Sequence, residues 1–166
     1  MQLFELTRAL VDIESTTNHE KNVGDYLFKH LSAVAARSNG KVHRMPAEQN
    51  RDNLLASWGE PAVTLSTHMD TVPPFFGSSE DEKFIFGRGA CDAKGIIAAM
   101  VTSAERLLES GTRNFGLLFV VGEERNSAGA RVAAAQPSGS RFLINGEPQT
   151  HAALRPVASN CVVMRV

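Results

Sequence analysis

Phe115-Gly116-Leu117-Leu118-Phe119-Val120-Val121 is a near-continuous apolar run. Such a run is typical of a strand that is buried on both faces of a sheet, because a half-exposed strand alternates apolar and polar residues. Gly122-Glu123-Glu124 follows the run directly. The sequence therefore predicts a central strand over residues 115–121 with two adjacent carboxylates at its end.

Helical and extended patterns alternate around this strand. Apolar residues recur at helical spacing over residues 95–109, and Gly111 is a suitable end for that helix. Residues 62–66 and 141–144 are short apolar runs, and residues 128–135 could form a short helix. The order strand, helix, strand, helix, strand predicts parallel βαβ units in a layered α/β domain.

The first third of the chain predicts two helices and one more strand. Residues 3–14 carry leucine and isoleucine at helical spacing. Thr17 and Glu20 stand three apart, as in a capping box, and predict the start of a second helix that ends at Asn39-Gly40. Residues 53–58 alternate as a strand does, whereas the polar segment 73–83 is expected to be a surface loop.

The composition fits an ordinary soluble domain. The chain has 166 residues, of which 43% are hydrophobic and 21% are charged. This length is enough for one domain with a core of its own. The net charge of −1 gives no strong attraction to nucleic acid or to an anionic membrane. No apolar stretch approaches the length of a membrane span, so we expect neither partner.

The N-terminus and the cysteines favour a cytoplasmic protein. Met1–Glu5 lacks the basic start and the apolar core of a signal peptide. Cys91 and Cys161 have no CxxC spacing. They could pair, but two cysteines in a chain without a signal peptide are expected to be reduced thiols.

His68 and Asp70 directly follow the predicted strand 62–66. Residues two apart in an extended segment point to the same face, so these two side chains can project together. This arrangement suits a metal-bound imidazole whose other ring nitrogen is held by a carboxylate. The alternative is a histidine and an aspartate in an ordinary surface turn.

Asp92 precedes the predicted helix 95–109, where an aspartate commonly caps the helix. Three glycines lie in residues 87–95 and allow unusual dihedral angles and close backbone approach, which suggests a further role. A dinucleotide fingerprint would need glycine in place of Asp92, and a P-loop would need Gly-Lys-Ser/Thr where this chain has Lys94-Gly95. Nucleotide binding is therefore disfavoured, and Asp92 is either a cap or a ligand.

Glu123 and Glu124 would be costly at the end of a buried strand unless their charge is compensated. A metal cation compensates it, with one glutamate as a ligand and the other as a proton acceptor. Glu147 has the same placement after strand 141–144. Solvated glutamates that open a loop are the alternative for each. Together, one histidine and three carboxylates form an oxygen-rich set that suits Zn, Co or Mn: His68, Asp92, Glu124 and Glu147.

Four motifs, in order along the chain, resemble those of the zinc metallopeptidase and amidohydrolase family of acetylornithine deacetylase, succinyl-diaminopimelate desuccinylase, aminoacylase and carboxypeptidase G. They are Ser66-Thr67-His68-Met69-Asp70-Thr71-Val72-Pro73, Gly87-Arg88-Gly89-Ala90-Cys91-Asp92-Ala93-Lys94-Gly95, Gly122-Glu123-Glu124 and Gly146-Glu147-Pro148. Four motifs in a fixed order are highly specific, and the resemblance covers about residues 1–148. It implies three layers, α/β/α, around a central, largely parallel (mixed) sheet.

The resemblance also implies a role for each site residue. The implied zinc ligands are His68 and Glu147 on one ion, Glu124 on the second, and Asp92 between the two. Glu123 would be the general base of amide hydrolysis by a metal-activated water, and Asp70 would orient His68. The peptide bond between Asp92 and Ala93 would be cis. The implied substrates are N-acyl amino acids, of the acetylornithine or diaminopimelate type, or small peptides.

The chain departs from the family pattern in its length. The family's enzymes insert a second domain, used for dimerisation and substrate closure, and then return to the catalytic domain with a last histidine ligand. Residues 1–148 are thus expected to be the N-terminal part of a catalytic domain that lacks the dimerisation domain of the homodimeric relatives. His151 is too close to Glu147 to match the last ligand. The other histidines lie upstream, at predicted packing or surface positions: His19, His30 and His43.

Residues 149–166 form an atypical tail. Gln149 stands where the family usually has threonine, and the apolar end 161–166 needs a partner surface. A truncated gene, a shifted reading frame or a fragment would each explain the tail. Two functions stay open: a zinc-dependent amidohydrolase, and a catalytically silent remnant that binds one metal ion or serves only as an interaction fragment.

We expect about one tightly bound zinc ion per chain and little or no hydrolysis, because Asp92 and Glu124 alone make a weak second site. Metal analysis of the purified protein and an amidase assay would check this expectation. Two tightly bound zinc ions, together with turnover that is lost in Glu123→Ala, would contradict the silent remnant.

Overall fold

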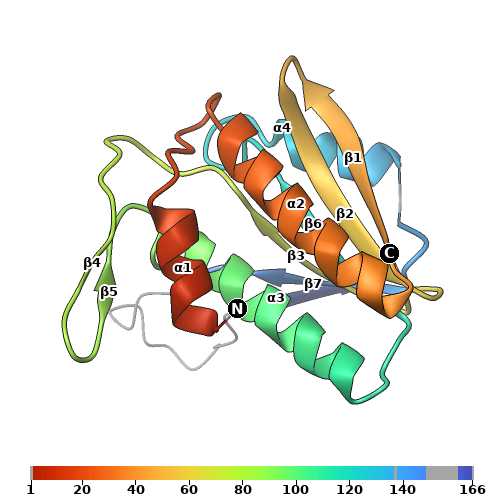
Figure 1. The fold of residues 1–166 in the computed structure, drawn as a ribbon. Helices are drawn as coiled ribbons and strands as arrows, with labels where there is room; N and C mark the ends of the chain where they lie inside the picture. Colours follow the sequence, from red (N-terminus) through yellow and green to blue (C-terminus); the bar gives the residue numbers. More distant parts are fainter. Residues whose placement is uncertain (1, 137, 149–160, 166) are drawn as a thin grey trace, which may run out of the picture.

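One six-stranded sheet organises the chain (Figure 1). The computed structural model describes residues 2–136, 138–148 and 161–165. The strand order across the sheet is β1 (Lys41–Glu48), β2 (Arg51–Trp58), β6 (Phe115–Val120), β3 (Val63–His68), β7 (Phe142–Gly146) and β8 (Cys161–Arg165).

The sheet is parallel at its centre and antiparallel at both edges. Strand β3 lies between β6 and β7 and runs parallel to both. The pairs β1–β2, β2–β6 and β7–β8 are antiparallel. This arrangement confirms the largely parallel, mixed central sheet. Because β6, β3 and β7 run in one direction, their carboxyl ends meet at one edge, where ligands bind in open α/β sheets.

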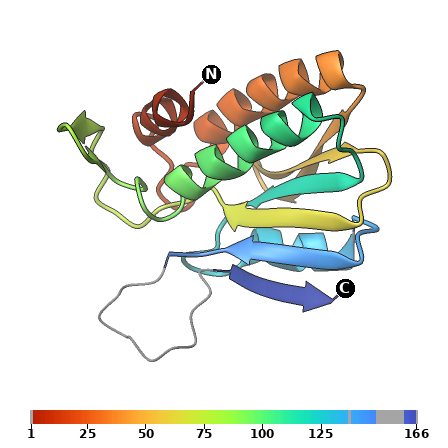
Figure 2. The ribbon, with the colours of Figure 1, turned by 90° about the horizontal axis from the view of Figure 1, so that it is seen from below.

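Helices cover both faces of the sheet (Figure 2). On one face lie α1 (Leu3–Val11), α2 (Lys21–Ser38) and α3 (Lys94–Glu109), and on the other lies α4 (Ala128–Ala135). Residues of β6 alternate between the two cores: Leu117 and Phe119 belong to the larger core with α1–α3, whereas Leu118 and Val120 belong to the smaller one beside α4. All six residues of β6 are buried, as its apolar run predicts.

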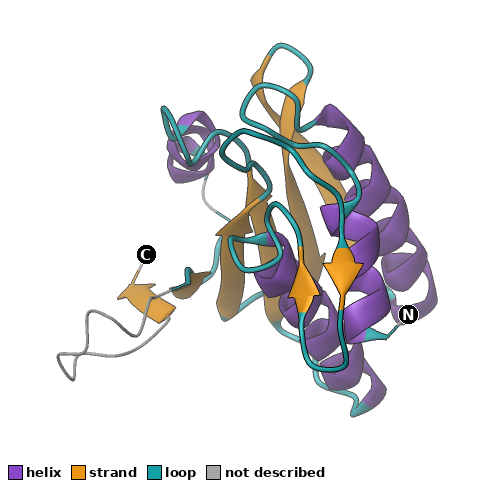
Figure 3. Ribbon diagram, turned by 90° about the vertical axis from the view of Figure 1, so that its left-hand side faces the viewer, coloured by secondary structure: helices purple, strands orange, loops and turns teal. Residues whose placement is uncertain are grey.

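Two features of the sheet periphery were not predicted. Strand β1 has one fully buried residue, Met45, so its sequence carries little apolar signal; pairing with β2 defines it. The segment predicted as a surface loop contributes to a small hairpin of β4 (Ser79–Glu80) and β5 (Ile85–Phe86), which forms a sheet of its own. It is nearest the viewer in Figure 3 and lies away from the main sheet in Figure 1.

The prediction of a capping box at the start of α2 is wrong. Glu20 is the N-cap residue, but it has helical dihedral angles, and no side chain caps the helix. Thr17 Oγ1 instead donates a hydrogen bond to Asp70 Oδ2 at 2.8 Å, and the Glu20 carboxylate accepts hydrogen bonds from Arg51. The side chains of Thr17 and Glu20 thus bond to buried residues that are distant in sequence, instead of capping the helix. The predicted end of the helix is confirmed, because Asn39 is its C-cap in the left-handed conformation.

Part of the predicted tail joins the sheet. The backbone of residues 161–165 pairs with β7 as the antiparallel edge strand β8. Gln149 and His151 lie outside the described residues, so their predicted roles are not tested. Cys91 is a free, exposed thiol. None of the described helices is long and apolar enough to cross a membrane.

Replacing Phe119, which is fully buried in β6, should destabilise the protein strongly. We expect Phe119→Ala to cost about 3–5 kcal/mol of unfolding free energy, because it removes apolar contacts and leaves a cavity. Phe84 is 61% exposed, so the matched control Phe84→Ala should change the unfolding free energy by less than about 0.5 kcal/mol. Urea unfolding measures both; equal losses in the two variants would contradict the assignment of β6 as the core strand.

Candidate metal centre

His68 is the last residue of β3, and its ring is 1% exposed. On one side, its Nδ1 lies 2.9 Å from the backbone oxygen of Asp70 and 3.4 Å from the Oδ1 atom of the same residue. With the Nδ1 proton donated to Asp70, Nε2 keeps a lone pair for a metal ion. Strand β3 thus ends in an imidazole whose orientation is fixed by Asp70, two residues further along the chain.

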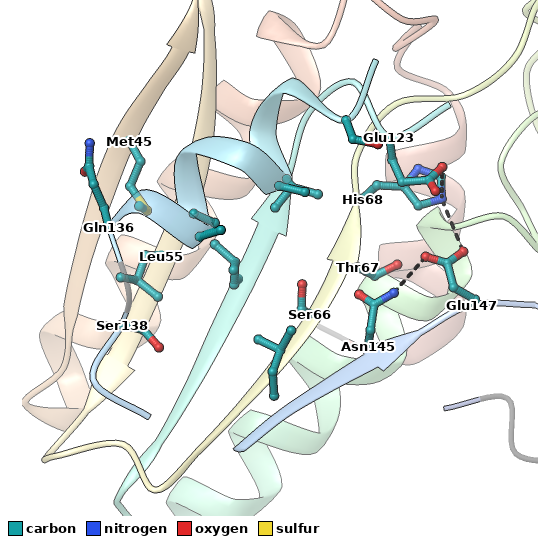
Figure 4. A pocket seen from close by; sticks show the side chains of 17 residues that line it. Met45, Leu55, Ser66, Thr67, His68, Glu123, Gln136, Ser138, Asn145 and Glu147 are labelled. Atoms are coloured by element: carbon teal, nitrogen blue, oxygen red, sulfur yellow. Dashed lines mark hydrogen bonds and ion pairs between the residues drawn. The ribbon is translucent and has the colours of Figure 1, made fainter. Parts of the chain in front are cut away.

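The His68 Nε2 atom faces carboxylates from three other segments, two of which, Glu123 and Glu147, are labelled in Figure 4. It lies 2.9 Å from Asp92 Oδ1, 3.7 Å from Glu147 Oε2 and 4.0 Å from Glu123 Oε2. Glu123 follows β6 and Glu147 follows β7, whereas Asp92 lies in the segment before α3, so all three meet His68 at the carboxyl edge of the parallel strands. Side chains that the sequence analysis singled out separately therefore meet at one place.

The Asp70 carboxylate is fully buried and joins His68 to the loop after β6. Its Oδ1 accepts a hydrogen bond from the backbone N–H of Glu123 at 2.9 Å, and its Oδ2 accepts one from that of Glu124 at 3.2 Å. Thr17 Oγ1 donates to Oδ2 as well. Burial raises the pKa of Asp70, but hydrogen bonds from His68 and Thr17 outweigh burial and hold this pKa below its usual value.

Asp92 does not cap the following helix. The N-cap residue of α3 is Ala93, and no side chain caps this helix, so the helix-cap alternative for Asp92 is wrong. The peptide bond between Asp92 and Ala93 is cis, which confirms the expectation from the family resemblance. Gly95 allows a close backbone approach here, since a Cβ at this position would lie 2.2 Å from the Ala90 carbonyl oxygen. The side chain of Asp92 instead faces His68, with Oδ1 2.9 Å from Nε2.

The carboxylates crowd one another, and their pKa values reflect it. Burial, together with the negative charge of Asp92, raises the pKa of Glu124. Burial also raises the pKa of Glu147, whose Oε1 accepts a hydrogen bond from Asn145 Nδ2 at 3.0 Å. Burial lowers the pKa of His68, but the carboxylates of Asp70, Asp92 and Glu147 outweigh burial and raise it to about 9. This excess of negative charge around one imidazole is the electrostatic setting of a cation site.

The donor atoms of this cluster fit a divalent cation. One ligand atom each from His68, Asp92 and Glu124 lies within 4.8 Å of the other two. An imidazole nitrogen with carboxylate oxygens is a ligand set that zinc and related ions accept. Within the described residues, these three side chains are the one such group, and it contains a single histidine. The structure thus supports a metal site at the place that the sequence predicted.

A pocket of about 370 Å³ opens beside the cluster, between the sheet and α4 (Figure 4). His68, Glu123 and Glu147 lie at one end of this pocket. Its wall is largely apolar and comes from β1, β2, β6 and β7, with the side chains of Met45, Leu55, Leu118, Val120 and Leu143. The site is therefore open to a small molecule on the side of the sheet that α4 covers.

The structure gives contacts to several polar residues for which the sequence predicted no role. Asn145 holds Glu147, and Lys94, which is fully buried, donates from Nζ to the carbonyl oxygen of Ile13 at 2.6 Å. Burial lowers the pKa of Lys94 to about 8. Arg51 and Asn53 are also buried and contact the region after β6. A usable signal was present at these last two positions, since charged and amide residues open a strand that is otherwise apolar.

The fold and the cluster together define a class of protein, an α/β domain with a candidate metal centre at the carboxyl edge of its parallel strands. The family model described as peptidase family M20/M25/M40 matches residues 64–158, which is more than half of the chain. The chain belongs to this peptidase family, a finding that confirms the resemblance.

Curated relatives match at moderate identity. A probable carboxypeptidase of Aspergillus flavus is 38% identical over 146 residues, covering 78% of this chain and 35% of the relative. A peptidase M20 domain-containing protein of Schizosaccharomyces pombe is 35% identical over 154 residues, covering 88% of this chain and 38% of the relative. The chain therefore spans little more than a third of the length of these relatives.

Solved structures match the fold. A tripeptidase from Staphylococcus aureus superposes with a TM-score of 0.77 at 22% identity, covering 89% of this chain and 43% of the other. Human carnosine dipeptidase 1 superposes with a TM-score of 0.75 at 17% identity, covering 89% and 38%. At such identities the likeness establishes the fold alone, and the fold is the one predicted.

The raised pKa of His68 makes the stability of the metal-free protein depend on pH. The folded pKa of about 9 lies above the ordinary value of 6.5, so the protonated ring stabilises the fold fully below pH 6.5, and this contribution is lost as the pH rises towards 9. Urea unfolding with a chelator present, from pH 6 to 9.5, measures it as the difference between the wild type and His68→Gln. Lys94 contributes with the opposite sign above about pH 8, but it cancels in this difference. A difference that stays constant over the range would contradict the assignment.

Proposed function

We propose that this chain carries the metal ligands and the general base of a metal-dependent hydrolase that cleaves amide bonds in small peptides or N-acyl amino acids. One observation carries the proposal: ligand atoms of His68, Asp92 and Glu124 lie within 4.8 Å of one another, and Glu123 and Glu147 border the same cluster. Membership of the M20/M25/M40 peptidase family supports it.

The proposed ligands divide between two ions. His68 and Glu147 would hold one ion, Glu124 would hold the other, and Asp92 would contact both. Zinc is the proposed metal, and cobalt or manganese would fit the same donors. A divalent cation bound here would supply Lewis acidity, which polarises a substrate carbonyl and lowers the pKa of water.

Glu123 is the proposed general base. It accepts the proton of the attacking water as the water oxygen bonds to the carbonyl carbon, and it returns the proton to the amine nitrogen as the C–N bond breaks. Three features suit it to this role: its side chain is 43% exposed, it stands beside the pocket, and its backbone is held by Asp70. Asp70 keeps the Nδ1 proton of His68 in place, so the Nε2 lone pair stays available for a ligand bond.

The substrate class rests on two supports. The similar proteins are named as a carboxypeptidase, a tripeptidase and a dipeptidase, which favours short peptides, whereas N-acyl amino acids are proposed from the motif resemblance alone. The largely apolar pocket beside His68 can take an apolar part of such a molecule. Residues 1–148 would be the N-terminal part of a catalytic domain, and a homodimer is proposed for a full-length relative rather than for this chain.

A second candidate function is metal binding without turnover. It is favoured by the ligand count, because Asp92 and Glu124 are the only proposed ligands of the second ion among the described residues. Two carboxylates without a histidine make a weaker site than the three or four protein ligands that zinc sites in proteins usually have. In that case the chain would bind one ion tightly and hydrolyse nothing.

Glu123→Gln separates the two functions. We expect the variant to keep the metal content of the wild type, since Glu123 is not a proposed ligand, and to lose turnover of an N-acyl amino acid or dipeptide by at least about 100-fold. Metal analysis and an amine-release assay measure the two effects. A wild type that binds one metal ion without turnover would support the second function. A wild type that binds no metal would contradict both.

A further inference from the structure

A tight turn at Gly122 sets the direction of Glu123 and Glu124. Gly122 has a φ of +72°, a conformation that favours glycine, and its carbonyl oxygen accepts hydrogen bonds from the backbone N–H groups of Asn126 and Ser127. The turn links the end of β6 to α4. Whatever holds this turn therefore also holds the proposed base and one proposed ligand.

A buried ion pair between Glu20 and Arg51 contacts the turn from the side of α2. Glu20 is 1% exposed and Arg51 is 4% exposed. Their contact is bidentate, with Arg51 Nη2 2.5 Å from Glu20 Oε1 and Nε 2.9 Å from Oε2. Glu20 Oε1 also accepts a hydrogen bond from the backbone N–H of Gly122 at 3.2 Å. The ion pair is thus hydrogen-bonded to the backbone of the turn through Glu20.

The guanidinium of Arg51 packs directly against the same turn. A Cβ added at Gly122 would lie 2.8 Å from Arg51 Nη2, so a side chain there would have to displace the buried guanidinium. Arg51 also contacts Glu48, whose other oxygen accepts a hydrogen bond from Asn126 Nδ2 at 3.1 Å. A second chain of contacts therefore runs from Arg51 to the far end of the turn.

Asn53 fastens the residues on either side of the turn. Its Oδ1 accepts a hydrogen bond from the N–H of Val121 at 3.1 Å, and its Nδ2 donates to the carbonyl oxygen of Gly129 at 2.8 Å. Asp70 holds the N–H groups of Glu123 and Glu124 from the opposite side. Each backbone N–H from Val121 to Glu124 thus meets a buried side-chain oxygen: those of Asn53, Glu20 and Asp70.

We propose that the Glu20–Arg51 pair is a positioning device, which fixes the Gly122 turn and thereby aims Glu123 and Glu124 at the metal centre. A buried ion pair adds little net stability, because the cost of removing both charges from water offsets their attraction. A role in geometry accounts for its placement against the turn. This inference rests on the proposed function, since it concerns residues to which that function gives the roles of base and ligand.

Glu20→Gln tests the proposal, because it keeps the shape of the side chain and removes its charge. In the metal-free protein, amide hydrogen exchange at residues 122–124 should accelerate at least about tenfold, while exchange in α3 stays as in the wild type. Titration with Co²⁺, followed by visible absorption, should give an affinity about tenfold weaker and shifted absorption bands. Arg51→Lys, which keeps the charge but loses the bidentate contact, should act in the same direction and serves if Glu20→Gln does not fold.

Asp25→Asn is the matched control. Asp25 also pairs with an arginine, Arg44, at 2.8 Å between α2 and β1, but it does not touch the turn. It should leave local exchange and Co²⁺ affinity unchanged. Unchanged exchange at residues 122–124 in Glu20→Gln, or acceleration spread evenly over the protein, would overturn the proposal. A wild type that binds no Co²⁺ would refute the proposed metal centre instead, and the exchange data would still decide whether the pair fixes the turn.

Discussion

The buried carboxylate of Asp70 is the interaction on which the site depends. It follows the central strand β3, and it accepts hydrogen bonds from Thr17 and from the N–H groups of Glu123 and Glu124. Its backbone oxygen meets His68 Nδ1 at 2.9 Å. One residue therefore connects the segment before α2, the end of β3 and the turn after β6. Since a buried carboxylate is costly without such partners, these contacts and the ionised state of Asp70 depend on one another.

The cluster around His68 holds several carboxylates close together, although their negative charges repel one another. Burial raises the pKa values of Glu124 and Glu147, and the negative charges of neighbouring carboxylates raise them further. Facing the single imidazole of His68, the carboxylates outweigh burial and raise its pKa to about 9. In the absence of a cation, these groups repel one another or hold a proton. The rest of the fold has to offset this unfavourable electrostatic free energy. The apolar burial of strand β6 between its two cores does so. The charge pattern is therefore an argument for a cation site that is independent of the family match.

Sheet topology explains why residues far apart in sequence share this site. Strands β6, β3 and β7 are parallel neighbours, so the side chains that follow them emerge at one edge. Asp92 reaches the same edge through the segment before α3, which packs on the sheet. The match to the two solved structures at TM-scores of 0.75–0.77 covers 89% of this chain, although the chain spans little more than a third of its curated relatives.

Local sequence determined the buried central strand, the helices and the residues that follow each strand, because apolar periodicity and strand-end polarity are readable within a few neighbours. It therefore predicted the fold class and the grouping of His68, Asp92, Glu124 and Glu147. It could not reveal the role of Thr17 and Glu20, which looked like a helix cap, because their partners Asp70 and Arg51 lie 53 and 31 residues away. Arg51 and Asn53 are visible as polar residues in an apolar strand, but their partners Glu20 and Val121 are likewise distant in sequence. Strand β1 escaped for another reason, because Met45 is its one buried residue and its apolar signal is weak. Only the tertiary structure decided these, since a buried polar side chain takes the partner that folding brings to it rather than the nearest one in sequence.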